Sequence, residues 1–449
     1  LPPRRMDSVV QLLEALESTP QELPVPALGR ALGACSTPVC RAVLGDPPPV
    51  PTSPPRNLSG AHWALLTQLL HHDPSAPHSG AVLAPDGTTL TLGPLLVGIE
   101  VGLKRASGWH HPTLEPGLDA LLAVTITEAL GTSFLLAGTA GTNLTTLGPD
   151  GCWDDIDAPQ NYTLLAPTSP IPDAVANGAM DGVLLGARLA QGPSPPLAEL
   201  LKGYYGTAEG TEQGRRVPSS YRRPRFGALV GAEKLAKEVA AVLEVLKVMP
   251  TTRRLMEGME QEEVVGIARR AARDFLEVYV ECPAIISRCT WGASPYRGTP
   301  TLLTLPLASV YIHHTFVPST PCASFATCAH AMRSMQAFHQ DARGWDDIGY
   351  SFVVGSDGYL YQGRGWHWVG AHTKGYNSRG YGLGYVGDFS SSLPQPDALS
   401  LVRDNFLPCA IKAGRLMPNY TIRGHRQLGT THCPGTALFQ EIQTWPGFQ

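Results

Sequence analysis

Near its carboxyl end the chain carries imidazoles and a thiol in a pattern that restricts how this region can fold. His425 precedes Cys433 by eight residues in the run His-Arg-Gln-Leu-Gly-Thr-Thr-His-Cys. Far upstream, the run Ser309 to Phe316 has no fixed charge, predicts a strand, and contains His313-His314. A catalytic zinc site has about three protein ligands plus a water. One histidine of this strand, His425 and Cys433 therefore predict a hydrolytic zinc site, if the loop that His425 and Cys433 bracket folds back over the strand.

Further motifs lie between these segments. They are Gly344-Trp-Asp-Asp-Ile-Gly-Tyr350-Ser-Phe352, Gly355-Ser-Asp-Gly-Tyr-Leu-Tyr-Gln-Gly-Arg-Gly-Trp366 and Val369-Gly-Ala-His372-Thr, followed by Gly424-His-Arg and Cys-Pro-Gly435. Together these residues resemble the peptidoglycan recognition protein domain. That family includes zinc-dependent N-acetylmuramoyl-L-alanine amidases and is similar to a bacteriophage amidase. The resemblance covers about residues 281 to 449, and the chain looks like the long, secreted, amidase-active type.

The resemblance implies roles for five residues. The Zn²⁺ ligands would be His314, His425 and Cys433, and only one of the two adjacent histidines can serve because strand neighbours face opposite ways. Non-catalytic members carry another residue in place of the cysteine. Tyr350 stands at the catalytic tyrosine position, where a phenol can steady a bound water or the developing charge. Thr431 matches a position near the leaving group, although a hydroxyl that caps a turn is an equal alternative.

Aromatic residues are concentrated in the same region. Residues 281 to 449 hold five of the eight Trp and nine of the 14 Tyr, which suits stacking on sugar rings and covering a peptide. Much of this must be core, so the groove candidates are restricted to Trp366, His367, Trp368, His372, Tyr376, Asn377 and Arg379. The pair His367-Trp368 fits neither common version of the family motif. The choice between diaminopimelate and lysine stems therefore stays open.

The chain is too long for one core. At 449 residues it exceeds the roughly 250 to 300 residues at which a single core stops growing. Residues 1 to 280 contain several segments with helical apolar spacing and predict a mostly α-helical N-terminal domain, with a Pro-rich linker or loop near 46–56 and an Asp86-Gly87 turn signal for a hairpin. Residues 281 to 449 alternate strand and helix patterns and predict an α/β domain with a central mixed β-sheet flanked by helices.

The elements expected in the C-terminal domain are few. They are a strand at 309–316, a helix at 326–340, a hairpin of strands 350–354 and 359–362, a strand at 382–389, a helix at 396–414 and a last helix from Thr436 to about Trp445.

The charge content of the chain excludes some classes of binding partner. With 16% charged residues and a formal net charge of −4, the chain shows no polyanion-binding footprint, so nucleic acid and an acidic membrane surface are poor partners. No apolar run approaches the ~20 residues of a membrane span. The start Leu1-Pro-Pro-Arg suits a mature secreted chain whose signal peptide has been removed. The sequons Asn57, Asn143, Asn161 and Asn419 agree with the secretory route as glycosylation sites.

The nine cysteines also agree with a secreted protein. If Cys433 binds zinc, an even number remains for disulfides in an oxidising compartment. The family resemblance implies the pairs Cys322–Cys328 and Cys282–Cys409. Cys35 and Cys40 are close enough for a local bridge, and the pairing of Cys152 and Cys289 stays open.

The predicted function is a secreted zinc amidase that cuts the bond between N-acetylmuramic acid and L-alanine, with bacterial peptidoglycan and muramyl peptides as its partners. One alternative is a recognition protein that binds these ligands without hydrolysing them. Another is that the helical half is the functional unit, as a partner-binding or dimerising domain. Oligomeric state and minimum glycan length stay open.

Overall fold

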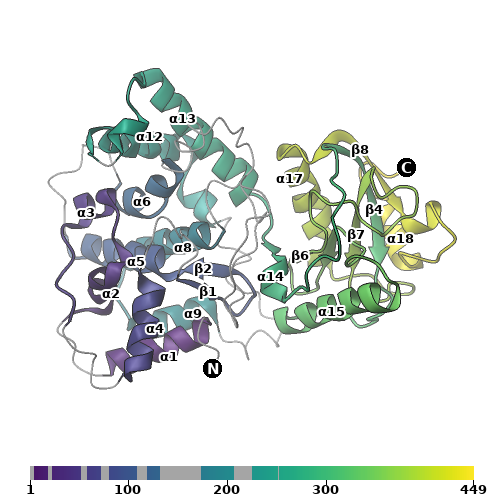
Figure 1. The fold of residues 1–449 in the computed structure, drawn as a ribbon, viewed down its shortest axis with the longest axis horizontal. Coiled ribbons are helices and arrows are strands. Elements are labelled where there is room, and N and C mark those ends of the chain that lie inside the picture. Colours follow the sequence, from purple (N-terminus) through teal and green to yellow (C-terminus); the bar gives the residue numbers. More distant parts are fainter. Residues whose placement is uncertain are drawn as a thin grey trace.

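The computed structural model describes residues 5–18, 23–51, 58–71, 80–108, 119–131, 173–206, 225–250 and 252–449. Figure 1 shows a body of helices formed by the N-terminal part, followed by a body built around a sheet. The predicted sequons at Asn57, Asn143 and Asn161, and Cys152, lie outside the described residues. None of the helices in the described part is long and apolar enough to cross a membrane.

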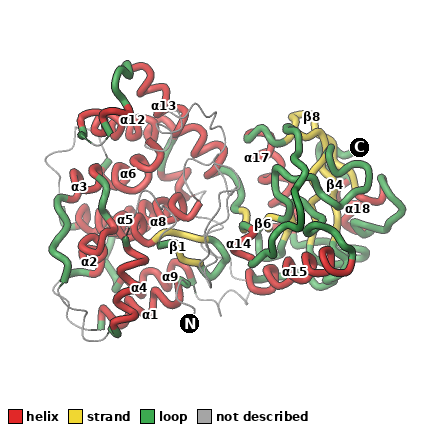
Figure 2. Tube along the Cα trace, viewed as in Figure 1, coloured by secondary structure: helices red, strands yellow, loops and turns green. Residues whose placement is uncertain are grey.

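The N-terminal part is mostly helical, as predicted (Figure 2). Most of these helices bury one apolar face, while α5 (Leu92–Ala106) and α8 (Asp173–Leu189) are buried on most sides, and the buried residues form two large clusters. Between the helices, β1 (Ala81–Leu83) and β2 (Thr89–Thr91) form the predicted antiparallel hairpin. The helices are α1 (Met6–Glu17), α2 (Val25–Gly29), α3 (Pro38–Leu44), α4 (Gly60–Leu70), α5 (Leu92–Ala106), α6 (Ala120–Leu122), α8 (Asp173–Leu189), α9 (Leu197–Tyr205), α12 (Ala232–Val248) and α13 (Gln261–Asp274).

The C-terminal part contains the predicted mixed sheet. Its strands are β3 (Ile285–Ile286), β4 (Leu307–His314), β5 (Phe352–Val354), β6 (Leu360–Gln362), β7 (Gly380–Tyr385) and β8 (Leu416–Gly424), in the spatial order β3-β6-β5-β7-β4-β8. β4 pairs in parallel with β7 and with β8, and only β5 and β6 pair antiparallel among these strands. β4 is therefore an interior strand, and the C-terminal ends of β7 and β8 lie beside the C-terminal end of β4.

Helices cover both faces of this sheet. Val310 and Ile312 of β4 share an apolar cluster with residues of α16 (Pro396–Ser400), α17 (Leu407–Lys412) and α18 (Thr436–Ile442). Val353 and Tyr361 share the opposite cluster with residues of α14 (Arg288–Trp291) and α15 (Phe325–Ala337). Because strand residues alternate between faces, Tyr311 and His313 lie on the α15 side.

Two strands were not predicted. β3 is very short, and β8 contains Pro418 and three consecutive exposed residues, so it lacks the alternation that marks a half-buried strand. β8 matters for the site because it pairs with β4 and ends at Gly424, directly before His425. The predicted helix 396–414 is formed by α16, a π-helical stretch Leu401–Phe406 and α17.

Disulfides occur in both parts of the chain. The structure pairs Cys282 with Cys409 and Cys322 with Cys328, the two pairs that the family resemblance implies, and it also joins Cys35 to Cys40. Cys289 is disulfide-bonded as well, and Cys433 is a free thiol. The Cys282–Cys409 bridge connects the chain just after the last N-terminal helical segment to α17.

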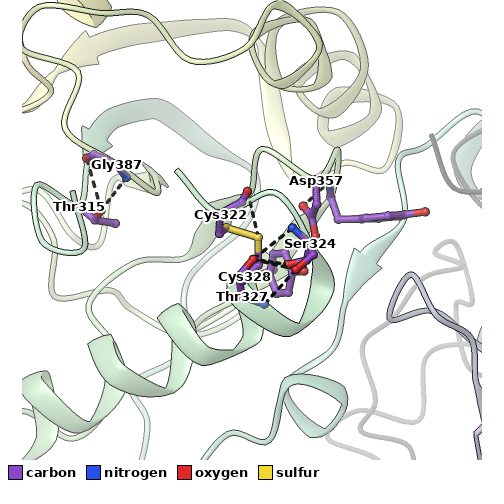
Figure 3. Close-up of a disulfide and its surroundings, with 9 residues drawn as sticks. Thr315, Cys322, Ser324, Thr327, Cys328, Asp357 and Gly387 are labelled. Atoms are coloured by element: carbon purple, nitrogen blue, oxygen red, sulfur yellow. Dashed lines mark hydrogen bonds between the residues drawn. A yellow bond between two sulfur atoms is a disulfide. The ribbon is translucent and has the colours of Figure 1, made fainter. Parts of the chain in front are cut away.

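The first turn of α15 is closely fixed. Ser324 Oγ accepts a hydrogen bond from the Thr327 amide, and the Ser324 amide donates to Thr327 Oγ1, which completes a capping box. Figure 3 shows this turn beside the Cys322–Cys328 bridge and Asp357. The helix that forms one wall of the site is thus anchored at its N-terminal end.

Two Asp-Gly turns meet where the two parts of the chain touch. Asp86 lies in the turn between β1 and β2, and its Oδ2 accepts a 2.7 Å hydrogen bond from the Tyr359 hydroxyl next to β6. Phe325 packs directly on Gly87, because a Cβ there would lie 2.2 Å from its ring. The β1–β2 hairpin therefore contacts both α15 and the turn that contains Asp357.

Asp357 makes stability depend on pH. Burial, opposed by the Tyr361 hydroxyl hydrogen bond and reinforced by the nearby charge of Asp86, raises the pKa of Asp357 to about 7. A carboxyl whose folded pKa is raised favours folding fully below its unfolded pKa, and this contribution is lost as pH rises through about 7.

We expect Asp357→Asn to become progressively more stable relative to the unsubstituted protein as pH rises from about 4 to about 8, because the amide has no charge to bury. Urea unfolding midpoints across this range measure the difference. Asp404→Asn is the control, since that exposed carboxyl is held ionised by Arg403 and its pKa is lowered. A difference between Asp357→Asn and the unsubstituted protein that stays constant with pH would contradict the assignment.

Candidate metal centre

Two imidazoles and a thiol converge at the end of β4. His313, His425 and Cys433 each offer a ligand atom, and these atoms lie within 4.8 Å of one another. His313 ends the α15-facing row of β4, His425 follows β8, and Cys433 lies in the loop before α18. Cys433 Sγ is 3.6 Å from His313 Nδ1.

This donor set fits Zn²⁺. With Zn–S near ~2.3 Å and Zn–N near ~2.0–2.1 Å, tetrahedral geometry separates a sulfur from a nitrogen ligand by about 3.6 Å. The observed distance between Cys433 Sγ and His313 Nδ1 has that value. Imidazole and thiolate are also the ligand types that zinc prefers, and a set of about three leaves a position open.

The prediction that His314 belongs to this set is wrong. His314 lies on the other face of β4, with Val310 and Ile312, and its Nδ1 accepts a 3.1 Å hydrogen bond from the Phe389 amide. Burial lowers its pKa, so the ring is a neutral hydrogen-bond acceptor at that site. The alternation of the strand correctly limited the choice to one histidine, but the loop that carries Cys433 reaches the face of His313.

Alternating glycines of β7 make room for the rings around the centre. A Cβ at Gly382 would lie 2.3 Å from the His372 ring, and one at Gly384 would lie 3.1 Å from the Tyr350 ring. These two glycines pair in register with Tyr311 and His313 of β4. The run Gly380-Tyr-Gly-Leu-Gly-Tyr385 thus presents bare backbone to the site and large side chains to the opposite core.

Tyr350 and Thr431 both border the centre, where the prediction placed them. The Tyr350 ring centroid is 5.5 Å from that of His313, and its hydroxyl donates a 3.5 Å hydrogen bond to the His314 carbonyl. Burial, reinforced by the charge of Cys433, raises the pKa of Tyr350 above its ordinary range, so the phenol keeps its proton. Thr431 Oγ1 accepts a 3.2 Å hydrogen bond from the Cys433 amide, which is the turn-capping role.

All of these groups open into one cavity of about 750 Å³. Residues of α15 and the segment after it, including Phe338 and His339, form one wall, and Phe316 and Val317 form an exposed apolar rim. Arg343 lines it too, and no carboxylate does among the described residues. The cavity therefore combines the histidines and the thiol of the metal centre with the exposed side chain of Arg343 and an apolar rim.

Burial sets the protonation of the side chains around the cavity. It lowers the pKa of His372 to about 3 and, with Arg343 nearby, lowers that of His339 to about 4, so both rings are neutral. Burial raises the pKa of the Cys433 thiol to about 12 in the absence of a metal. The thiolate is the form that attacks as a nucleophile and also the form that binds a metal, so this raised pKa does not distinguish the two roles of Cys433.

Of the predicted groove residues, only His372 lines this cavity. His367 Nε2 is 2.7 Å from Arg415 Nη1, and the Trp368 ring packs against Tyr296. Asn377 Oδ1 accepts hydrogen bonds from the amides of His372 and Thr373 and so shapes the loop. Tyr376 packs on Tyr311, and Arg379 lies over the Tyr376 ring.

The prediction for Trp366 is wrong. Its indole is 8% exposed and stacks on Phe406 at 5.0 Å in the core beneath α17. It was kept as a groove candidate because aromatic residues are concentrated in residues 281 to 449. In three dimensions it faces the core opposite the metal centre.

Four residues of the cavity region were not singled out from the sequence. His339, Arg343 and Trp345 belong to the segment after α15, where His339 stacks on Trp345 at 4.7 Å. Thr373 follows His372 in the motif Val369-Gly-Ala-His372-Thr, and the sequence alone gives its hydroxyl no role. The helical spacing of Met335 and Phe338 was the available signal for the α15 wall.

Sequence comparison finds similar proteins along almost the whole chain. A sequence profile described as N-acetylmuramoyl-L-alanine amidase matches residues 304–436. The chain is 43% identical to an N-acetylmuramoyl-L-alanine amidase of Mus musculus, covering 99% of this chain and 94% of the relative. It is 40% identical to the protein of that name from Homo sapiens, covering 99% and 91%.

Shorter relatives match the C-terminal part. Peptidoglycan-recognition protein 2 of Holotrichia diomphalia is 39% identical over 40% of this chain and 95% of its own length. Among solved structures, Drosophila PGRP-LB is 40% identical and covers 37% of this chain and 95% of its own, with a TM-score of 0.36.

We expect His313→Ala to weaken Zn²⁺ binding by at least about 100-fold, because losing even an outer partner of a ligand costs 10- to 100-fold. His314→Ala is the matched control. It should keep the affinity and instead cost about 1–3 kcal/mol of folding free energy, since the Phe389 amide loses its acceptor. Competition with a chromophoric chelator and urea unfolding measure the two effects, and the reverse pattern would restore His314 as the ligand.

Proposed function

The chain belongs to the N-acetylmuramoyl-L-alanine amidase family, and on that premise we propose that it hydrolyses the lactyl amide of muramyl peptides with Zn²⁺ held by His313, His425 and Cys433. The observation that carries the proposal is the free Cys433 thiol at zinc-ligand distance from His313 Nδ1. We place the amidase domain at residues 281–449, which contain every donor and the matched segment.

Each group around the centre has a distinct task. Zinc, when bound, polarises the scissile carbonyl and lowers the pKa of an attacking water to roughly 7. Tyr350 keeps its proton and can donate a hydrogen bond to the oxygen on which negative charge develops. Thr431 holds the Cys433 amide and so fixes the loop that carries the thiol, and its side chain also borders the cavity where the leaving group would lie.

A binding protein without hydrolysis is the alternative function. Binding alone does not require two imidazoles and a thiol to converge on one point. A free thiol held beside two imidazoles is the arrangement that an open zinc site needs.

The direct test is mass-spectrometric detection of free stem peptide from a defined muramyl pentapeptide. We expect release of a peptide that begins with L-alanine, its loss in a chelator and its recovery with added Zn²⁺. Cys433→Ser should lower the rate by more than about 100-fold, because one of the ligands is gone. Persistent turnover in chelator would exclude the zinc mechanism, and binding without release would leave a recognition protein.

We further propose that Arg343 binds a carboxylate of the stem peptide. Its guanidinium lies over the rings of Phe338 and Trp345, at 5.4 and 5.7 Å, and no ion pair joins it to a carboxylate in the described part of the chain. The cavity that it borders has no acidic residue of its own. An anionic peptide would therefore find an attractive potential and one fixed cation.

A matched pair of substrates tests this role. We expect Arg343→Gln to raise KM about 10-fold for a muramyl peptide whose second residue has a free carboxylate, since a charge-assisted hydrogen bond contributes about 1.5–3 kcal/mol. The same substitution should change KM little for the analogue with a carboxamide there, and Arg343→Lys should restore part of the difference. Equal effects on both substrates would contradict the assignment.

We also propose that the protein acts outside the cell. Stable disulfides persist mainly in oxidising compartments, and the structure contains Cys35–Cys40, Cys282–Cys409 and Cys322–Cys328. The sequon Asn419 lies exposed on β8, where a glycan can be accommodated.

A further inference from the structure

Behind the metal centre, one hydroxyl links two buried histidines. Thr373 Oγ1 lies 3.3 Å from His313 Nε2 and 3.0 Å from His372 Nδ1. Thr373 and His313 are each 1% exposed, so water does not compete for these contacts. The backbone of this loop is held by Asn377, whose side-chain oxygen accepts from the amides of His372 and Thr373.

The far end of this chain of contacts is unsatisfied. His372 Nε2 is buried and has no hydrogen-bond partner among the described residues. The backbones of Gly370 and Gly382 pack so closely on the His372 ring that a Cβ atom at either glycine would lie 2.3 Å from it. This packing restricts rotation of the ring. His372 also lines the cavity. A buried polar atom without a partner costs about 1–3 kcal/mol, so its retention beside a cavity points to a ligand.

We propose that the Thr373 hydroxyl is a positioning group that fixes the tautomers of His313 and His372 together, an inference that rests on the proposed zinc site. His313 Nδ1 faces Cys433 and must be free of a proton to bind metal, so Nε2 carries the proton and donates it to Thr373 Oγ1. The Thr373 hydroxyl then donates to His372 Nδ1, which leaves the proton of His372 on Nε2.

Two consequences follow from this order of donors. The ring of His313 is held in one orientation, as outer partners commonly do for zinc-bound histidines. The Nε2–H of His372 becomes a hydrogen-bond donor that has no acceptor among the described residues. It can therefore donate to an oxygen of the bound substrate. Thr373 therefore acts through His313 and His372 and does not itself touch substrate.

Zinc affinity tests the positioning role separately from turnover. Thr373→Val keeps the shape of the side chain and removes the hydroxyl, and we expect it to weaken Zn²⁺ binding by about 10- to 100-fold in competition with a chromophoric chelator. Thr373→Ser keeps the hydroxyl and should recover most of the affinity. Thr421→Val is the control, because it removes a hydroxyl that contacts only Ser309 at another point of the same sheet.

The imidazole tautomers give a second readout that general destabilisation would not reproduce. In ¹⁵N NMR of the folded, zinc-loaded protein, we expect His372 to carry its proton on Nε2 alone, and in Thr373→Val to become a mixture of both neutral tautomers. Assignment uses the resonances missing in His372→Gln.

The outcomes separate the two proposals. Unchanged zinc affinity in Thr373→Val, or equal loss in the valine and serine variants, would overturn the positioning role. An unsubstituted protein that binds no Zn²⁺ would instead overturn the proposed function on which this inference rests.

Discussion

The alternation of side chains along β4 is the constraint on which the site depends. β4 lies between β7 and β8 in parallel register, so its two faces belong to different compartments of the domain. One face, with His314, completes an apolar core, and the other, with His313, meets the loop that carries Cys433. Because β8 ends directly before His425, the same pairing that aligns the sheet also delivers the second imidazole.

Burial gives this small group of residues its chemistry. His313, His372 and Tyr350 are kept neutral by desolvation, which makes the rings ligands or hydrogen-bond donors and acceptors of defined direction. The glycines of β7 allow these rings to lie against the backbone. The helix α15, which forms one wall of the site, is anchored at its start by its capping box and the adjacent Cys322–Cys328 bridge (Figure 3). The β1–β2 hairpin packs on the same end of this helix through Gly87 and Phe325.

Local patterns predicted the strands and helices that frame the centre, and the motif around His425 and Cys433 predicted its chemistry. The alternation of strand residues could not say which face of β4 the Cys433 loop would reach, and the family resemblance implied His314, whereas the structure brings His313 to the thiol. The burial of Trp366 depends on Phe406, which is distant in sequence. The role of Thr373 likewise depends on a contact with a strand 60 residues away, which no local spacing encodes.

The position of the metal ion tests most directly whether His313, His425 and Cys433 form the site. Diffraction from crystals of the zinc-loaded protein, measured on both sides of the zinc absorption edge, locates the ion without reference to activity. We expect one anomalous peak within ligand distance of His313 Nδ1, His425 and Cys433 Sγ. A peak beside His314, or a zinc ion closed by a fourth protein ligand, would contradict it.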